Sequence, residues 1–170
     1  RMVPYKRFDL VIQVFNRLKI PLKIFGDGPE EEKLKKIAKS NIEFVGRVSD
    51  KEKAELLSKA RAFIHPQVED LGITPIESMA SGRPVIAYGV GGVTETVVPD
   101  KTGMFFEHQS WESLLDAIVH FDHNSWDSQL IRERAKKFAI DEFKNKMKKY
   151  TEDRYEEFTR GLNQCRLDIR

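Results

Sequence analysis

The sequence has little cysteine, no long hydrophobic run and no excess of one charge. Its single cysteine, Cys165, excludes an intramolecular disulfide and a cysteine metal cluster, and we expect it to be a spectator in a reducing compartment. No apolar run approaches the roughly 20 residues of a membrane-spanning helix. The 29 basic and 27 acidic residues are too balanced to indicate nucleic-acid binding. With 170 residues, 40% of them hydrophobic, the chain is long enough to form one hydrophobic core.

Short apolar runs alternate with amphipathic stretches over the first 121 residues. The predicted strands are residues 22–25, 42–45, 62–64, 84–88 and 104–106. The predicted helices are residues 8–18, 30–38, 51–60, 75–81 and 111–121. This alternation predicts an α/β fold with a Rossmann-like, doubly wound parallel sheet covered by helices on both faces.

Residues 127–162 are predicted to form one or two long charged helices. Apolar side chains recur there at helical spacing: Leu130, Ile131, Ala135, Phe138, Ala139, Phe143, Met147 and Tyr150. We expect most of them to pack on the domain's own sheet. Because the chain opens on Arg1 rather than methionine, we also expect it to be a fragment.

The segment from Glu69 to Ala87 combines two carboxylates, a glycine turn and the start of a helix. The free amides of Gly72, Ile73 and Thr74, together with the helix dipole, are suited to hold a diphosphate or a donor sugar. The alternative is a plain loop with a favourable helix start. Carboxylates beside such amides suit the hydroxyl groups of a phosphorylated sugar.

Glu77 has two interpretations. It can accept hydrogen bonds from ribose hydroxyls, or it can complete a capping box with Thr74, with Pro75 as the first helical residue. Glu69 has no capping role and lies in a predicted loop after a strand, where functional residues concentrate.

This segment resembles the signature of the retaining glycosyltransferases called family four, which have the GT-B fold. Glu69 and Glu77 are separated by seven residues, and residues 80–85 match the family's Ala-x-Gly-x-Pro-Val; Leu71 stands where an aromatic is usual. Further matching pieces are Arg1 with Lys6-Arg7, Gly26-Asp27-Gly28-Pro29, Gly46-Arg47-Val48, Gly91-Gly92 with Glu95, and Thr102-Gly103. Residues 66–77 and 86–89 are especially similar to O-antigen-type mannosyltransferases.

The resemblance implies that residues 1–170 are the nucleotide-sugar (donor) binding half of a GT-B enzyme, without its N-terminal acceptor domain. It implies mannose transfer from GDP-mannose to a glycan or lipid-linked acceptor, with poor turnover by the isolated domain. We expect a cytoplasmic protein, with possible peripheral association at the cytoplasmic membrane face. The alternatives are a GT-B nucleotide-sugar epimerase and a non-catalytic nucleotide-binding or regulatory module.

The resemblance also implies roles for single residues. Glu69 faces the donor sugar as the candidate catalytic residue, Glu77 binds the ribose, and Arg1 and Lys6 bind the diphosphate. Lone basic residues such as Lys6 are otherwise most often solvated. No Asp-x-Asp motif is evident, so we expect no metal and no cofactor beyond the donor substrate.

The predicted base pocket lies at residues 46–53. The resemblance implies that backbone at Val48 binds the base edge and that Asp50 and Lys53 read guanine, whose N1–H and amino group suit a carboxylate. The same stretch also fits a helix cap formed by Ser49 and Glu52.

For two glycine pairs and one histidine, the question is whether they belong to a binding site. Gly26 and Gly28 lack the third glycine of a dinucleotide fingerprint, and acids follow them, which disfavours a nicotinamide enzyme. Gly91-Gly92 lines the donor site or serves tight packing alone. His65, at a predicted strand end near Glu69, borders the site or is structural.

Overall fold

A computed structural model describes the backbone of residues 1–167 and the side chains of residues 1–161. Cys165 therefore lies outside the described side chains. The chain divides into two compact units, Arg1–Ala135 and Lys136–Arg170. The predicted alternation of strands and helices is confirmed in the first unit, where every predicted strand and helix is present.

The strands of the first unit form two parallel sheets. β1 (Leu22–Phe25) pairs with β2 (Ile42–Gly46). The second sheet has the order β3-β4-β5, with bounds Phe63–His65, Val85–Tyr88 and Gly103–Phe106. β1 and β3 are not hydrogen-bonded to each other, so the expected single sheet is divided at this point.

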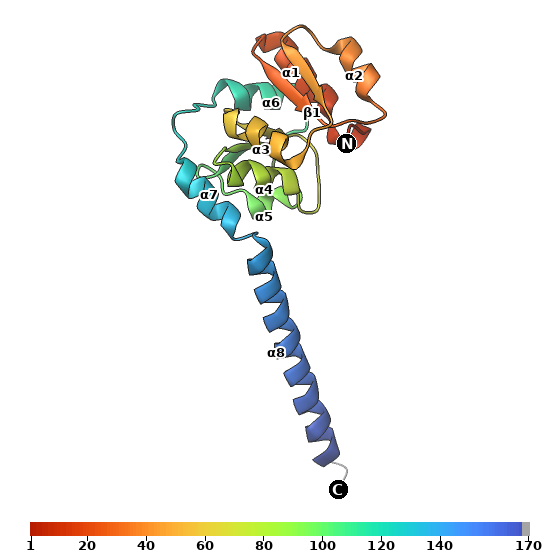
Figure 1. Ribbon diagram of the computed structural model, residues 1–170, viewed down its shortest axis with the longest axis vertical. Coiled ribbons are helices and arrows are strands. Elements are labelled where there is room, and N and C mark those ends of the chain that lie inside the picture. Colours follow the sequence, from red (N-terminus) through yellow and green to blue (C-terminus); the bar gives the residue numbers. More distant parts are fainter. Residues whose placement is uncertain (168–170) are drawn as a thin grey trace. The chain divides into compact units, whose positions relative to one another are not determined.

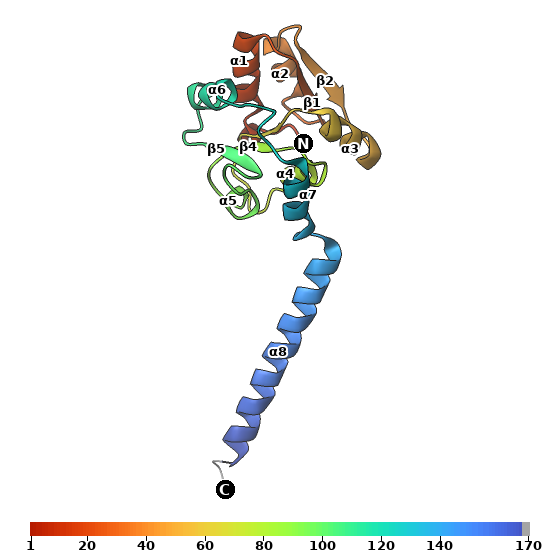
Figure 2. The same cartoon turned by 90° about the vertical axis from the view of Figure 1, so that its left-hand side faces the viewer.

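One hydrophobic core nevertheless joins the two sheets. Ile24 and Ile42 from the first sheet lie in the same buried cluster as Ile86 and Phe106 from the second. The rings of Phe25 in β1 and Phe63 in β3 approach to 6.5 Å between centroids. The layered α/β arrangement therefore follows the sequence prediction (Figures 1 and 2).

The helices of the first unit cover these sheets. In chain order they are the 3-10 turn Pro4–Lys6, α1 (Phe8–Leu18), α2 (Glu31–Ile37), α3 (Asp50–Lys59), α4 (Ile73–Ala80), α5 (Val93–Thr96), α6 (Trp111–Val119) and α7 (Ser128–Lys136). α1 and α6 lie side by side (Figure 2), and the guanidinium of Arg17 stacks on the Trp111 ring at 3.9 Å. Ile131 and Ala135 of α7 pack with Met79 and Val85 in a second core.

The second unit is dominated by one 28-residue helix, α8 (Ile140–Leu167). Ile131 and Ala135, in α7, pack as expected; Phe143, Met147 and Tyr150, in α8, have exposed side chains, and their packing on the sheet stays a prediction. Charged side chains are frequent on α8, and i,i+4 pairs such as Lys148 with Glu152 stabilise the helix. In the part of the chain that the structure describes, no helix is long and apolar enough to span a bilayer.

Candidate functional site

α4 begins at a residue in the left-handed backbone conformation. Gly72 is its N-cap, with φ of 74°, and no side chain caps the first turn. The first amides of a helix have no acceptor within the helix, so those of Ile73 and Thr74 remain available to an external anion. The geometry therefore agrees with the predicted anion site, which stays a prediction.

The helix start differs from the one expected for a capping box at Glu77. α4 begins at Ile73 rather than Pro75, so Thr74 is the second helical residue and not the N-cap. Pro75 is tolerated in the first turn because its missing N–H would have no intrahelical acceptor there. The capping interpretation of Glu77 is therefore wrong, because its carboxylate does not cap α4.

The carboxylate of Glu77 instead pairs with α3. The Nζ of Lys53 lies 2.7 Å from the Oε1 of Glu77 and 3.1 Å from the Oδ1 of Asp50. The contact with Glu77, and to a smaller extent that with Asp50, raises the pKa of Lys53, although desolvation acts in the opposite direction. Glu77 keeps 32% of its side chain exposed, so it remains accessible to a ligand.

The predicted helix cap of α3 is present beside this pair. Ser49 accepts from the Glu52 amide, and Glu52 accepts from the Ser49 amide at 2.7 Å. Because Ser49 and Glu52 form the cap, Asp50 is not needed for it and points into solvent. Val48 lines a separate open pocket of about 200 Å³ with Val45, Glu52, Glu55, Leu56 and Lys59. The structure brings Asp50 and Lys53 together but does not place them in this pocket.

Glu69 precedes Gly72, the N-cap of α4, by three residues. Its Oε1 is 2.6 Å from the Nζ of Lys6, which brings the predicted catalytic carboxylate and the predicted diphosphate cation into one ion pair. Burial tends to raise the pKa of Glu69, but the hydrogen bond and charge of Lys6 outweigh it and hold the pKa below its ordinary value. Glu69 is therefore a carboxylate at neutral pH.

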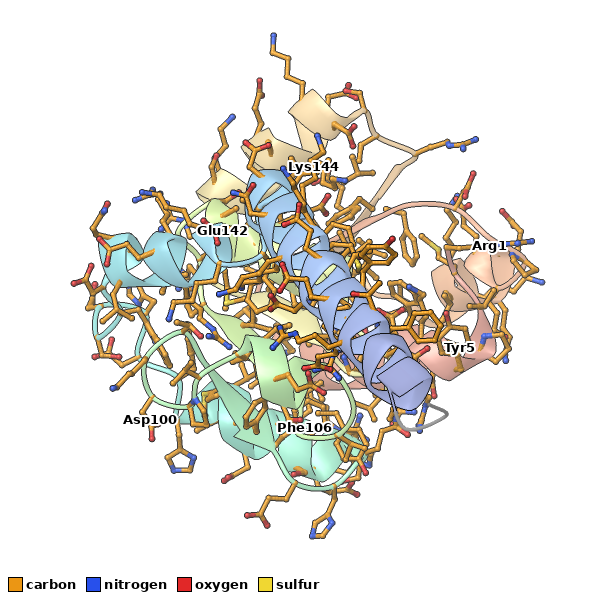
Figure 3. All side chains as sticks on the ribbon, turned by 90° about the horizontal axis from the view of Figure 1, so that it is seen from below. Arg1, Tyr5, Asp100, Phe106, Glu142 and Lys144 are labelled. Carbon is orange, nitrogen blue, oxygen red and sulfur yellow. The ribbon has the colours of Figure 1, made fainter. Side chains whose placement is uncertain are left out.

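Arg1 lies near this ion pair at the carboxyl end of β1. Its backbone nitrogen is 3.9 Å from the position that a Cβ on Gly26 would occupy. The neighbouring Met2 donates its amide to Asp27 at 2.6 Å, and a Cβ on Gly28 would collide with Met2. The Gly26–Gly28 turn thus holds the segment that carries Arg1 and Lys6. In Figure 3, Arg1 lies on the same side of the molecule as Tyr5, which precedes Lys6.

Two glutamines support the Glu69 loop and were missed from the sequence. Gln67 is buried, and its side chain hydrogen-bonds to Glu69. Gln109 donates to the carbonyl of Pro66 at 2.8 Å and accepts from Arg7 at 3.2 Å. Neither glutamine belongs to a motif, so no sequence signal indicated these contacts.

The Gly91-Gly92 turn is packed directly against the Glu69 loop. The amide of Gly92 donates to the carbonyl of Glu69 at 2.8 Å, and a Cβ on Gly92 would lie 1.9 Å from the carbonyl oxygen of Asp70. The turn is therefore tightly packed against the backbone of Glu69, and its lining of the donor site stays a prediction.

Replacing Gly92 by alanine is therefore expected to displace the Glu69 loop. The new methyl group has no space, so the loop must move, and we expect Gly92→Ala to lose about 1–3 kcal/mol of folding stability. Gly161→Ala is the control, because a Cβ there meets nothing within 4 Å. Urea unfolding of both variants measures the loss. Equal stability of the two variants would contradict the expectation.

His65 is the last residue of β3 and is fully buried beside Glu69. Its Nε2 lies 4.0 Å from the Oε2 of Glu69. Burial lowers the pKa of His65 to about 4, and the charge of Lys6 acts in the same direction, while Glu69 opposes it. The ring is therefore neutral at pH 7, and the prediction that it borders the candidate site is consistent with its position.

The low pKa of His65 predicts a pH-dependent stability. Between pH 4 and pH 6.5 the unfolded chain binds a proton that the folded chain does not, so stability falls as the pH decreases through this window. We expect the loss from His65 between pH 7.5 and pH 5 to be on the order of 2 kcal/mol. Urea unfolding at both pH values, compared between the wild type and His65→Phe, measures it; an equal pH dependence in both would contradict the assignment.

A match to a protein family extends over most of the chain. Residues 1–154 match the family model described as glycosyl transferases group 1. The chain belongs to this family. An uncharacterised glycosyltransferase of Methanocaldococcus jannaschii is 30% identical over 142 residues, which cover 81% of this chain and 40% of that protein.

Two further relatives carry more specific names. A GDP-mannose-dependent alpha-(1-6)-phosphatidylinositol monomannoside mannosyltransferase of Mycobacterium tuberculosis is 32% identical over 70% of this chain and 36% of its own length. The O-antigen chain mannosyltransferase C of Escherichia coli is 28% identical over 67% of this chain and 33% of its own. This chain thus spans well under half the length of these relatives.

Solved structures of GT-B proteins share the fold. Sucrose-phosphate synthase of Thermosynechococcus elongatus superposes with a TM-score of 0.79 at 24% identity, over 90% of this chain and 43% of that one. HepE of Anabaena, in complex with UDP and glucose, gives a TM-score of 0.75 at 17% identity, over 90% and 46%. This glycosyltransferase chain therefore has the GT-B type of Rossmann-like domain that the sequence predicts.

Among the residues whose side chains are described, no group of three or more histidine, cysteine, aspartate and glutamate side chains is placed to hold a metal ion. The acids of the site are instead held by lysines, Glu69 by Lys6 and Glu77 by Lys53.

Proposed function

We propose that residues 1–170 form the donor-binding domain of a retaining glycosyltransferase that takes mannose from GDP-mannose. The observation that carries the proposal is the start of α4, whose first turn has no side-chain cap and which is flanked in the sequence by two partly exposed carboxylates, Glu69 and Glu77. Relatives named as GDP-mannose-dependent mannosyltransferases support the choice of donor. No observation favours epimerisation or a purely regulatory module over transfer.

Each part of the donor has a matching group in this proposal. The diphosphate binds the amides of Gly72, Ile73 and Thr74 and the cations Arg1 and Lys6. The ribose hydroxyls donate to Glu77. The base contacts the backbone of Val48, with Asp50 and Lys53 reading guanine.

The reaction breaks the bond between the anomeric carbon and the diphosphate oxygen and forms a bond to an acceptor hydroxyl on the same face. The fixed cations and amides stabilise the negative charge that grows on the leaving GDP. Glu69 stabilises the positive charge that grows at the anomeric carbon. The leaving phosphate accepts the proton of the acceptor hydroxyl, so no base from this domain is required.

The acceptor, a glycan or lipid-linked saccharide, binds in this proposal to an N-terminal domain outside this chain. Both domains are needed to bring the donor and the acceptor together and to exclude water. Residues 1–170 alone therefore bind the nucleotide but turn over poorly. Peripheral association of the whole enzyme with the cytoplasmic membrane face is part of the same proposal.

Calorimetric titration of residues 1–170 with GDP, UDP, ADP and their sugar conjugates tests the proposal. We expect GDP and GDP-mannose to bind most tightly and Asp50→Ala to weaken them more than it weakens UDP. Preference for a uridine nucleotide would remove GDP-mannose as the donor. Absence of binding by both this chain and the whole natural protein would contradict the donor-domain assignment.

A further inference from the structure

His65 is a buried polar residue with a ring nitrogen that makes no hydrogen bond within the described part of the chain. Its side chain is 1% exposed, and its Nδ1 has no hydrogen-bond partner among the described residues. A buried polar atom without a partner costs stability, and a phenyl ring of similar shape would avoid this cost. Packing of β3 therefore gives no reason for a histidine at this position.

The other edge of the ring faces the candidate site. The Nε2 lies 4.0 Å from the Oε2 of Glu69, while the Oε1 of the same carboxylate is held by Lys6. The Cε1 and Nε2 would also lie 3.5 Å from a Cβ on Gly72, so the ring edge reaches the start of α4. The Nε2 edge of His65 thus lies next to Glu69 and Gly72, the predicted sugar-binding and phosphate-binding residues.

The surroundings favour one tautomer. A neutral imidazole carries a single N–H, and on Nε2 this N–H points at the carboxylate of Glu69. The opposite tautomer would turn the Nε2 lone pair toward the carboxylate and bury an N–H without an acceptor. The Nε2–H form is therefore the more stable one and presents a donor to Glu69.

Donor binding changes the partners of Glu69 if the proposed function holds, because Lys6 is then shared with the diphosphate. The Oε1 of Glu69 then loses part of its ion pair at the moment when the carboxylate must face the sugar. His65 is positioned to compensate, since a movement of about 1 Å brings its Nε2 to hydrogen-bond distance of Oε2.

We propose that His65 is a positioning residue that holds Glu69 toward the donor sugar through its Nε2–H when Lys6 engages the diphosphate. This inference rests on the proposed function. It assigns the neutral ring a directional role that a phenyl ring of the same shape cannot perform.

The test compares three variants in the whole natural protein. Glutamine places an amide N–H near the position of Nε2, asparagine places it near Nδ1, and phenylalanine keeps the ring without a donor. We expect His65→Gln to retain most of the GDP release from GDP-mannose, and His65→Asn and His65→Phe to lose about tenfold in rate at saturating donor. GDP affinity is expected to stay within about twofold in all three, and the thermal midpoint of His65→Phe to be unchanged or higher.

A double-mutant cycle with Glu69→Gln separates positioning from structural support. If His65 acts through Glu69, His65→Phe causes no further loss in the Glu69→Gln background. A wild-type rate for His65→Phe, equal rates for His65→Gln and His65→Asn, or the same loss with and without Glu69 would each overturn the role. Should His65→Phe fail to fold, the Gln and Asn pair decides alone. If the wild type neither binds GDP nor releases it from GDP-mannose, the proposed function itself fails.

Discussion

Replacing Glu69 by glutamine is expected to lower GDP-mannose turnover by about two to three orders of magnitude, the usual loss when one electrostatic stabiliser of a transition state is removed. The same change is expected to leave GDP affinity unchanged or higher. Lys6 is bound to Glu69 at 2.6 Å, and a neutral glutamine releases this cation for the diphosphate. Turnover is therefore expected to fall without a loss of GDP affinity.

The measurement is GDP release by the whole natural protein together with calorimetry on GDP. Glu43→Gln is the matched control, because Glu43 also pairs with a lysine, Lys23 at 2.6 Å, on the exposed surface of β2. Full turnover in Glu69→Gln would remove Glu69 from the chemistry, whatever its effect on affinity.

Replacing Glu77 by glutamine is expected to weaken GDP binding by about tenfold to a hundredfold, since a hydrogen bond to a charged group contributes about 1.5–3 kcal/mol. The loss should be smaller for a 2′,3′-dideoxy analogue of GDP, which lacks the hydroxyls that Glu77 is proposed to bind. Stability should change little, because Glu77 caps no helix and its partner Lys53 keeps Asp50.

Calorimetry with both nucleotides on Glu77→Gln, with Glu43→Gln alongside, measures this difference. An equal loss for GDP and its dideoxy analogue would assign Glu77 to the support of Lys53 rather than to the ribose. Unchanged affinity for GDP would remove Glu77 from the binding site.

Local patterns predicted the elements well but the site contacts poorly. The apolar runs of β1 to β5 and the Ser49–Glu52 box of α3 are local signals, and the structure has them at the expected positions. The Thr74–Glu77 box was an equally good local pattern, yet α4 starts earlier, at Ile73, with Gly72 as its N-cap. Proline is tolerated throughout a helix's first turn, so Pro75 did not fix the helix start.

Contacts between segments that are distant in the chain produce no periodic pattern in the sequence. The ion pairs of Lys6 with Glu69 and of Lys53 with Glu77 join residues that only the packed fold brings together. The resemblance named all four residues but gave them to different parts of the donor. Helical spacing likewise identifies the apolar face of α8 that carries Phe143 and Met147, but it does not identify what covers that face.

The pairing of each site carboxylate with a lysine also bears on ionic strength. A nucleotide that meets bare cations binds much more weakly as salt is added, because dissolved ions screen the attraction. Here Lys6, the lysine proposed to bind the diphosphate, is already paired with Glu69, so an arriving diphosphate replaces one close anionic partner of Lys6 by another. Nucleotide affinity should therefore be less sensitive to salt than the number of basic groups suggests, with recognition resting more on directed amides and hydroxyl contacts.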